Sequence, residues 1–259
     1  MGSLAGKSPA NTYKSLLKVA DETNGVSSSA SRIEDGEGTS SCASIGTRNL
    51  AITPDTNSTT TFTVNTAAGS AVLTADTSNS TVKVGSAHVN TQILEFSAYK
   101  LLPVAGTHYF IPCSSGVFNS TTTLNELSNG TGTDPATTLD AGDTTDELVC
   151  MLFLAPYNLT IDGVTFMVST DTDTDTTINV HLYKFTMTNA GGTSDGNLTS
   201  GTLLANGQAT SVDRNVLKTV SASIDSSSVS ADEVIACFVE NVTNTDDINI
   251  RVQVKYHIA

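Results

Sequence analysis

The residue pattern with the most recognisable chemistry is a short segment that contains a serine. Residues 192–196 read Gly-Thr-Ser-Asp-Gly and match the G-x-S-x-G pattern of hydrolase nucleophile elbows, in which a strained turn between a strand and a helix exposes the serine. The residues that follow, 197–201, cannot begin a helix of useful length. Because glycine and serine also concentrate in turns, we interpret the segment as a loop without a catalytic residue.

A second pattern could hold a cation. Asp171, Asp173 and Asp175 alternate with threonines, as carboxylates do at the start of an EF-hand loop, and hard oxygen ligands suit calcium. The rest of that motif is missing, since Thr176 replaces the glycine of the sharp turn and Leu182 replaces the bidentate glutamate. We expect a solvated hairpin loop here, and calcium binding together with other chains is the alternative hypothesis.

The histidines and cysteines show no spacing typical of a metal site. Neither HxH nor HxxxH occurs among the four histidines, which are His88, His108, His181 and His257. His181 and His257 lie on strand candidates and are expected on a polar or interface face. The four cysteines, which form no CxxC pair, are Cys42, Cys113, Cys150 and Cys237. We expect all four to be free thiols, and we expect Cys150 and Cys237 to be buried and inert. We therefore predict no metal and no cofactor.

Glycoside cleavage has little support in the sequence. A glycosidase needs two carboxylates beside a sugar-binding cleft, usually with aromatic platforms. The chain has no tryptophan, only 5% of its residues are aromatic, and its acidic residues concentrate in expected turns. We predict that the protein is not an enzyme.

Charge and hydropathy exclude two further classes of partner. Twelve basic residues stand against 26 acidic ones, for a net charge of −14, which repels nucleic acid and anionic lipid alike. No segment approaches the ~20 apolar residues of a membrane helix. Residues 1–7 lack the apolar core of a secretory signal, so we expect a soluble chain without an export signal.

The secondary structure that carries the residues discussed above is predicted to consist of β-strands. Thr, Ser, Asn, Asp and Gly supply most polar positions and favour strands and turns over helices. After residues 13–19, no amphipathic run with a period of 3.6 residues is convincing. The expected fold class is all-β, with an N-terminal extended segment and short strands followed by a C-terminal β-sandwich of jelly-roll type.

Three segments are expected. Residues 1–46 are polar and rich in Gly and Ser, so they should be disordered alone and serve as an extended docking segment. Residues 47–91 form a short-strand oligomerisation module with strands at 49–53, 61–65, 71–75 and 81–84. These short strands need a second layer, most simply another copy of the chain, so a closed homotrimer is predicted.

Residues 92–259 are expected to form the sandwich. The strand candidates are 93–99, 108–112, 147–154, 159–169, 177–188, 216–224, 233–242 and 248–258. Apolar residues alternate strictly with polar ones in 248–258, which indicates one buried face. Residues 147–154 and 234–239 are apolar on both faces, as in central strands or strands at a subunit interface.

Several short segments of the N-terminal part resemble a known family of proteins. Residues 11–19 and 31–41, with 69–80 and 82–85, resemble the N-terminal region of virion structural and fibre proteins of tailed bacteriophages, particularly those of marine bacteria. The resemblance covers about the first 90 residues and implies a mounting module shared by different appendages; it carries no catalytic residue. Residues 155–157 and 161–164, with the last strand, look like the jelly-roll knobs that cap phage fibres.

The sequence thus favours one function over two others. The leading hypothesis is a virion structural subunit, as tail fibre, head fibre or capsid decoration, which is assembled in the host bacterial cytoplasm and docks on other virion proteins. The alternative is a module for host attachment that binds a receptor or surface glycan through loops such as residues 190–201. An enzyme acting on surface polysaccharide ranks last.

Overall fold

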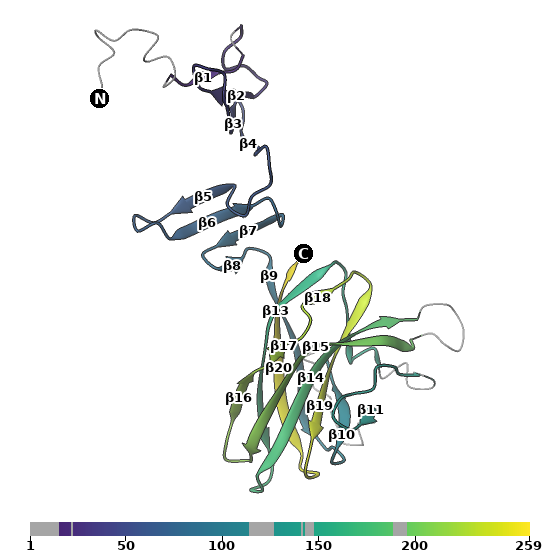
Figure 1. Cartoon of the computed structure of the whole chain (residues 1–259). Helices are drawn as coiled ribbons and strands as arrows, with labels where there is room; N and C mark the ends of the chain where they lie inside the picture. Colours follow the sequence, from purple (N-terminus) through teal and green to yellow (C-terminus); the bar gives the residue numbers. More distant parts are fainter. Residues whose placement is uncertain (1–15, 22, 114–126, 141, 143–147, 189–195) are drawn as a thin grey trace. The chain divides into compact units, whose positions relative to one another are not determined.

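The computed structural model describes residues 16–21, 23–113, 127–140, 142, 148–188 and 196–259. All twenty elements with described bounds are β-strands, β1 to β20 (Figure 1). The chain divides into two compact units, Met1–Val89 and Asn90–Ala259. The prediction of an all-β chain is confirmed, and the division between the units lies close to the predicted boundary at residues 91 and 92. In the described residues, no helix is long and apolar enough to cross a membrane.

The first sheet of the N-terminal unit is an antiparallel meander. It contains β1 (Lys18–Val19), β2 (Ser31–Glu34), β3 (Ser40–Ile45) and β4 (Leu50–Ile52), paired in that order. Because β3 pairs with β4, the sheet crosses the boundary predicted at residue 46, and residues 18–45 are not simply extended. The turn after β2 is fixed by Asp35 Oδ1, which accepts the Glu37 and Thr39 amides at 2.9 Å. Gly38 has a φ of 86°, which favours glycine.

The second sheet of this unit follows the predicted strands. It orders β5 (Phe62–Asn65), β6 (Ala71–Asp76), β7 (Thr81–Val84) and β8 (Ala87–His88), all antiparallel. Asn79 caps the turn before β7, because Asp76 accepts hydrogen bonds from its amide at 2.9 Å and from its side chain at 2.8 Å. The same side-chain hydrogen bond is the main cause of the lowered pKa of Asp76. The turn residues predicted between β6 and β7 therefore form the hydrogen bonds that join these strands.

The C-terminal unit is a sandwich of two antiparallel sheets. The five-stranded sheet contains β16 (Lys218–Ser221), β13 (Leu159–Thr170), β20 (Ile248–Ile258) and β9 (Thr91–Leu101) in this order, with β18 (Ser228–Val229) paired to β13. The seven-stranded sheet contains β11 (Ser128–Thr131), β10 (Thr107–Ile111), β19 (Glu233–Asn241), β14 (Thr176–Met187), β15 (Leu198–Val212) and β17 (Ser223–Ile224), with β12 (Leu152–Leu154) paired to β19. This arrangement confirms the predicted sandwich.

The main core lies between these two sheets. Phe96, Phe166 and Val252 from the five-stranded sheet pack with Ile178 and Ile235 from the other, and all five side chains are fully buried. Along β20 the apolar side chains are buried at alternate positions, as the sequence predicts. Full burial of a side chain of this size stabilises the fold by about 1.5 to 3 kcal/mol.

The outer face of the seven-stranded sheet carries a second core. Phe110, Phe185 and Phe238 pack there under Leu148 and Met151. Covering on both faces is why residues 234–239 of β19 are all apolar, so their interpretation as a covered strand is confirmed.

The similar prediction for residues 147–154 is wrong for most of the segment. Only Leu152–Leu154 is a strand, and Met151 donates its amide to the Leu148 carbonyl in a turn. The apolar residues before the strand belong to a segment that covers the sheet, while residue 147 lies outside the described residues. An apolar run alone does not distinguish these two structures.

Strand β15 was not predicted, because small and polar residues fill it. These residues permit close packing, since a Cβ on Gly201 would lie 2.6 Å from the Phe185 ring and 2.7 Å from Thr137 Cα. The loop expected at residues 190–201 is therefore partly a strand, from Leu198 onward, and residues 190–195 lie outside the described residues. The single strand expected at 216–224 is split into β16 and β17, which belong to different sheets.

Candidate functional site

The predicted aspartate loop lies between strands of different sheets. β13 ends at Thr170 and β14 begins at Thr176, so the segment is a connection between sheets and not the expected hairpin. Asp173 forms an ion pair with Arg214 at 2.5 Å and accepts a hydrogen bond from the Asn215 side chain at 2.8 Å. The Asp173 carboxylate is thus already partnered within the chain.

The G-x-S-x-G segment lies mostly outside the described residues. Of its five residues only Gly196 is described, with a φ of 84°. The next element is the strand β15, not the helix that a nucleophile elbow requires. This confirms that no helix begins at residues 197–201.

The cysteines are free thiols, as predicted. Burial raises the pKa of Cys113 to about 11 and also raises that of the fully buried Cys237, which disfavours the reactive thiolate. Cys150 is only partly buried, which differs from the prediction, because the segment around it is a turn rather than a central strand.

His257 and Asp162 form one polar pair of the sandwich. His257 lies on β20, and its Nδ1 is 3.0 Å from both carboxylate oxygens of Asp162. Asp162 is placed by an irregularity in the pairing of β13 with β20 between Ile161 and Gly163. We predicted that His257 lies on a polar or interface face of its strand, and its contact with Asp162 agrees with the polar face.

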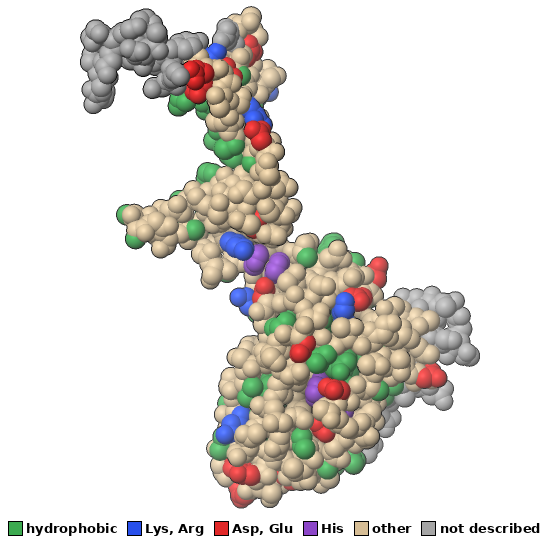
Figure 2. Space-filling model, in the orientation of Figure 1, with side chains coloured by type: hydrophobic (Ala, Val, Ile, Leu, Met, Phe, Trp, Pro, Cys, Tyr) green, Lys and Arg blue, Asp and Glu red, His purple; other side chains and the backbone are tan. Residues whose placement is uncertain are grey.

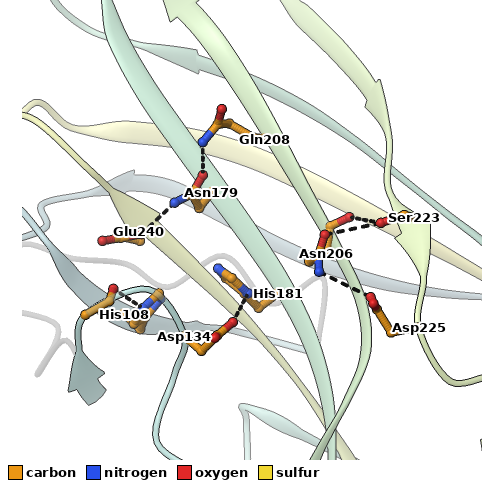
Figure 3. A network of polar contacts seen from close by, with 10 residues as sticks. His108, Asp134, Asn179, His181, Asn206, Gln208, Ser223, Asp225 and Glu240 are labelled. Carbon is orange, nitrogen blue, oxygen red and sulfur yellow. Dashed lines mark hydrogen bonds and ion pairs between the residues drawn. The ribbon is translucent and has the colours of Figure 1, made fainter.

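A second polar cluster lies on the outer face of the seven-stranded sheet (Figure 3). His108 on β10 stands directly opposite Glu240 on β19. His181 lies on β14, the strand on the other side of β19. One ligating atom from each of these three residues lies within 4.8 Å of the others. All three side chains are buried, with at most 5% of their surface exposed.

One hydrogen bond of the His108 ring indicates its tautomer. Its Nε2 lies 3.1 Å from the Gly132 carbonyl oxygen, which can only accept, so Nε2 carries the proton. In the neutral ring Nδ1 then carries a lone pair, and this buried atom has no hydrogen-bond partner. The His108 and His181 rings meet edge to face, with centroids 5.0 Å apart.

His181 is held neutral at pH 7. Burial is the main cause of its lowered pKa, about 4, and His108 lowers it further while Asp134 opposes the change. Asp134 Oδ1 is 3.6 Å from His181 Nδ1, which is longer than a hydrogen bond. Neither ring nitrogen of His181 has a hydrogen-bond partner.

Glu240 is oriented by a chain of amides. Asn179 Nδ2 donates to Glu240 Oε2 at 2.8 Å, and Gln208 Nε2 donates to Asn179 Oδ1 at 2.8 Å (Figure 3). No basic residue of the described ranges forms an ion pair with Glu240. Among the described residues, the neutral amide of Asn179 therefore positions this carboxylate.

The sequence did not reveal this cluster, because its members come from three strands that are distant along the chain. One signal was present. His181 and Glu240 lie within or next to runs that are apolar on both faces, where a polar residue must be buried. Spacing along one element cannot show which such residues meet across strands.

Comparisons with known proteins identify no family for this chain. No protein-family model matches the chain, and no curated protein is similar to it in sequence. Among solved structures, a chain of "Structure of infectious bursal disease virus Gx strain" is similar with a TM-score of 0.25 and 11% identity. The match covers 72% of this chain and 63% of the virus chain, so this chain spans less than two thirds of that chain's length.

Proposed function

We propose that this protein is a non-enzymatic structural subunit of a bacteriophage particle that assembles as a homotrimer through its N-terminal unit. One observation carries the proposal: the sheet β5–β8 has an apolar face that no described strand of its own unit covers. The resemblance of the first 90 or so residues to phage virion proteins supports the assignment to a bacteriophage particle.

The strand register defines this apolar face. Phe62 stands opposite Ala75, and Val64 stands opposite Leu73. Leu73 and Ala75 in turn stand opposite Val84 and Val82, so all six side chains share one face. Thr63, Thr74 and Lys83 occupy the other face. We call the six residues the β5–β7 apolar face.

This face is exposed to an unusual degree. Phe62, Val64, Val82 and Val84 expose between 42% and 57% of their surface. Hydrophobic side chains reach the surface of the N-terminal unit in Figure 2. A contiguous exposed apolar patch marks an interaction surface in a soluble protein.

The N-terminal unit lacks a core of its own. Among its described residues no apolar side chain is buried, whereas the C-terminal unit buries more than thirty apolar residues. A sheet of this size needs a second layer to be stable. A closed arrangement of identical copies supplies that layer from the same chain and leaves no unpaired apolar face.

The oligomeric mass of the full chain tests this proposal. We expect a trimer by native mass spectrometry and by light scattering at micromolar concentration. Val84→Asp places a charge on the β5–β7 apolar face and should give a monomer, while Thr74→Asp on the opposite face should leave the trimer intact. A monomeric wild-type chain would contradict the proposed assembly.

The particle assignment needs a separate test. Phage particles without this protein should lack one projecting or decorating feature in electron micrographs. Particles with every surface feature intact would show that the protein is not a structural component.

A further inference from the structure

We propose that His108, His181 and Glu240 bind one divalent transition-metal ion, with zinc the best fit, which ties β10, β19 and β14 together. The proposal is independent of the particle role and of the trimer. It rests on four features of the cluster: unpartnered lone pairs, an unpaired buried charge, outer partners that orient the ligands, and burial.

The first feature is the pair of imidazoles. The proton on His108 Nε2 faces the Gly132 carbonyl oxygen, and Nδ1 presents a buried lone pair with no partner. His181 is equally buried, and both its ring nitrogens lack hydrogen bonds. Leaving a buried polar atom without a hydrogen-bond partner is unfavourable. A bound ion would satisfy one nitrogen of each ring.

The second feature is the charge of Glu240. Glu240 exposes only 4% of its surface, and among the described residues its carboxylate receives a hydrogen bond only from the neutral amide of Asn179. A buried carboxylate without a counter-charge is strongly unfavourable. A divalent cation between Glu240 and the two imidazoles supplies that charge.

The third feature is the set of outer partners. A ligating histidine usually donates its second ring N–H to a carbonyl or carboxylate, and His108 has the Gly132 carbonyl in this role. Asp134 Oδ1 lies 3.6 Å from His181 Nδ1, so a small movement would form the corresponding hydrogen bond and leave Nε2 as the ligating atom. Gln208 and Asn179 orient Glu240 in the same way.

The ligand set and its burial identify the class of ion. Two imidazoles and one carboxylate suit zinc and neighbouring transition metals, whereas calcium and magnesium prefer oxygen ligands alone. Three protein ligands leave the fourth position of a tetrahedral zinc ion to water or another small ligand. Burial of all three side chains between paired strands favours an ion that stabilises the fold.

Metal titration of the full chain tests the proposal. After removal of metals with a chelator, Zn²⁺ should bind at the site with a stoichiometry of one per chain and raise the melting temperature, while Ca²⁺ and Mg²⁺ should do neither. Co²⁺ should give the visible absorption of a tetrahedral site. Absence of the cobalt band together with an unchanged melting temperature in Zn²⁺ would overturn the proposal.

Variants separate this site from incidental binding elsewhere. Glu240→Gln keeps the shape of the side chain and should weaken zinc binding roughly 100-fold, since loss of an outer partner alone weakens it about 10- to 100-fold. The metal-free variant should remain folded, because the change removes a buried charge. His257→Gln removes a histidine elsewhere in the sandwich and should retain the cobalt band. Retention of that band in both Glu240→Gln and His181→Gln would assign the ion to other groups, such as the exposed Cys42, and would overturn the proposal.

Discussion

The two units use the same alternation of apolar and polar residues and reach opposite outcomes. The seven-stranded sheet of the C-terminal unit is covered on both faces, by the five-stranded sheet on one and by Leu148 and Met151 on the other. The sheet β5–β8 of the N-terminal unit has its apolar face exposed. The comparison teaches that a strand pattern produces a core only where the chain also supplies a second layer.

The largest expected effect is in the sandwich core. Phe166→Ala should lower the free energy of unfolding of the C-terminal unit by about 3 to 5 kcal/mol, because the ring is fully buried between the sheets. Phe62→Ala on the β5–β7 apolar face should change the unfolding of the monomer by less than about 0.5 kcal/mol. Denaturant unfolding measures both. Similar losses of unfolding free energy for both variants, at concentrations where the chain is a monomer, would contradict the expected difference between the units.

The next effect concerns the polar cluster and pH. Since the pKa of His181 is lowered from 6.5 to about 4, the unfolded chain takes up a proton below pH 6.5 that the folded chain does not bind. The free energy of unfolding should therefore fall as pH decreases from 6.5 to 4, by up to roughly 3 kcal/mol.

Unfolding in chelator at several pH values measures this loss. His181→Gln should remove that part of the pH dependence, and His257→Gln should keep it. An equal loss in wild type and His181→Gln would show that other groups cause the acid sensitivity.

A smaller effect should follow from crowding the outer face of the sheet. Gly201→Ala should cost about 1 to 3 kcal/mol, since the new Cβ would meet the Phe185 ring and the Thr137 backbone. Gly163→Ala is the matched change in another strand, where no atom lies within 4 Å of the new Cβ. Thermal unfolding should separate the two variants. If Gly201→Ala is as stable as Gly163→Ala, the covering layer is looser than the structure shows.

The smallest effect is expected at the aspartate loop. Asp173→Asn removes an ion pair whose two side chains are each 57% exposed, so the loss of stability should be below about 1 kcal/mol. Calorimetric titration of the wild-type chain with calcium should give no heat. Heat that disappears in the variant would instead revive the calcium hypothesis for Asp171, Asp173 and Asp175.

The sequence predicted the strands that carry a clear period of two residues. β20 and β5 to β7 lie where they were expected, because alternation and turn residues act locally. β15 was missed because its small residues fit close packing instead of an apolar pattern. Residues 148–151 were assigned to a strand because an apolar run looks the same in a strand and in a covering segment.

By itself, therefore, the sequence determined the all-β class, the division near residue 90 and the polar character of the aspartate loop. Only the tertiary structure decided that His108, His181 and Glu240 meet and that the described part of the N-terminal unit leaves the β5–β7 apolar face exposed. The physical reason is that both depend on pairing between strands. Register across a sheet is set by contacts between distant segments, which no local pattern encodes.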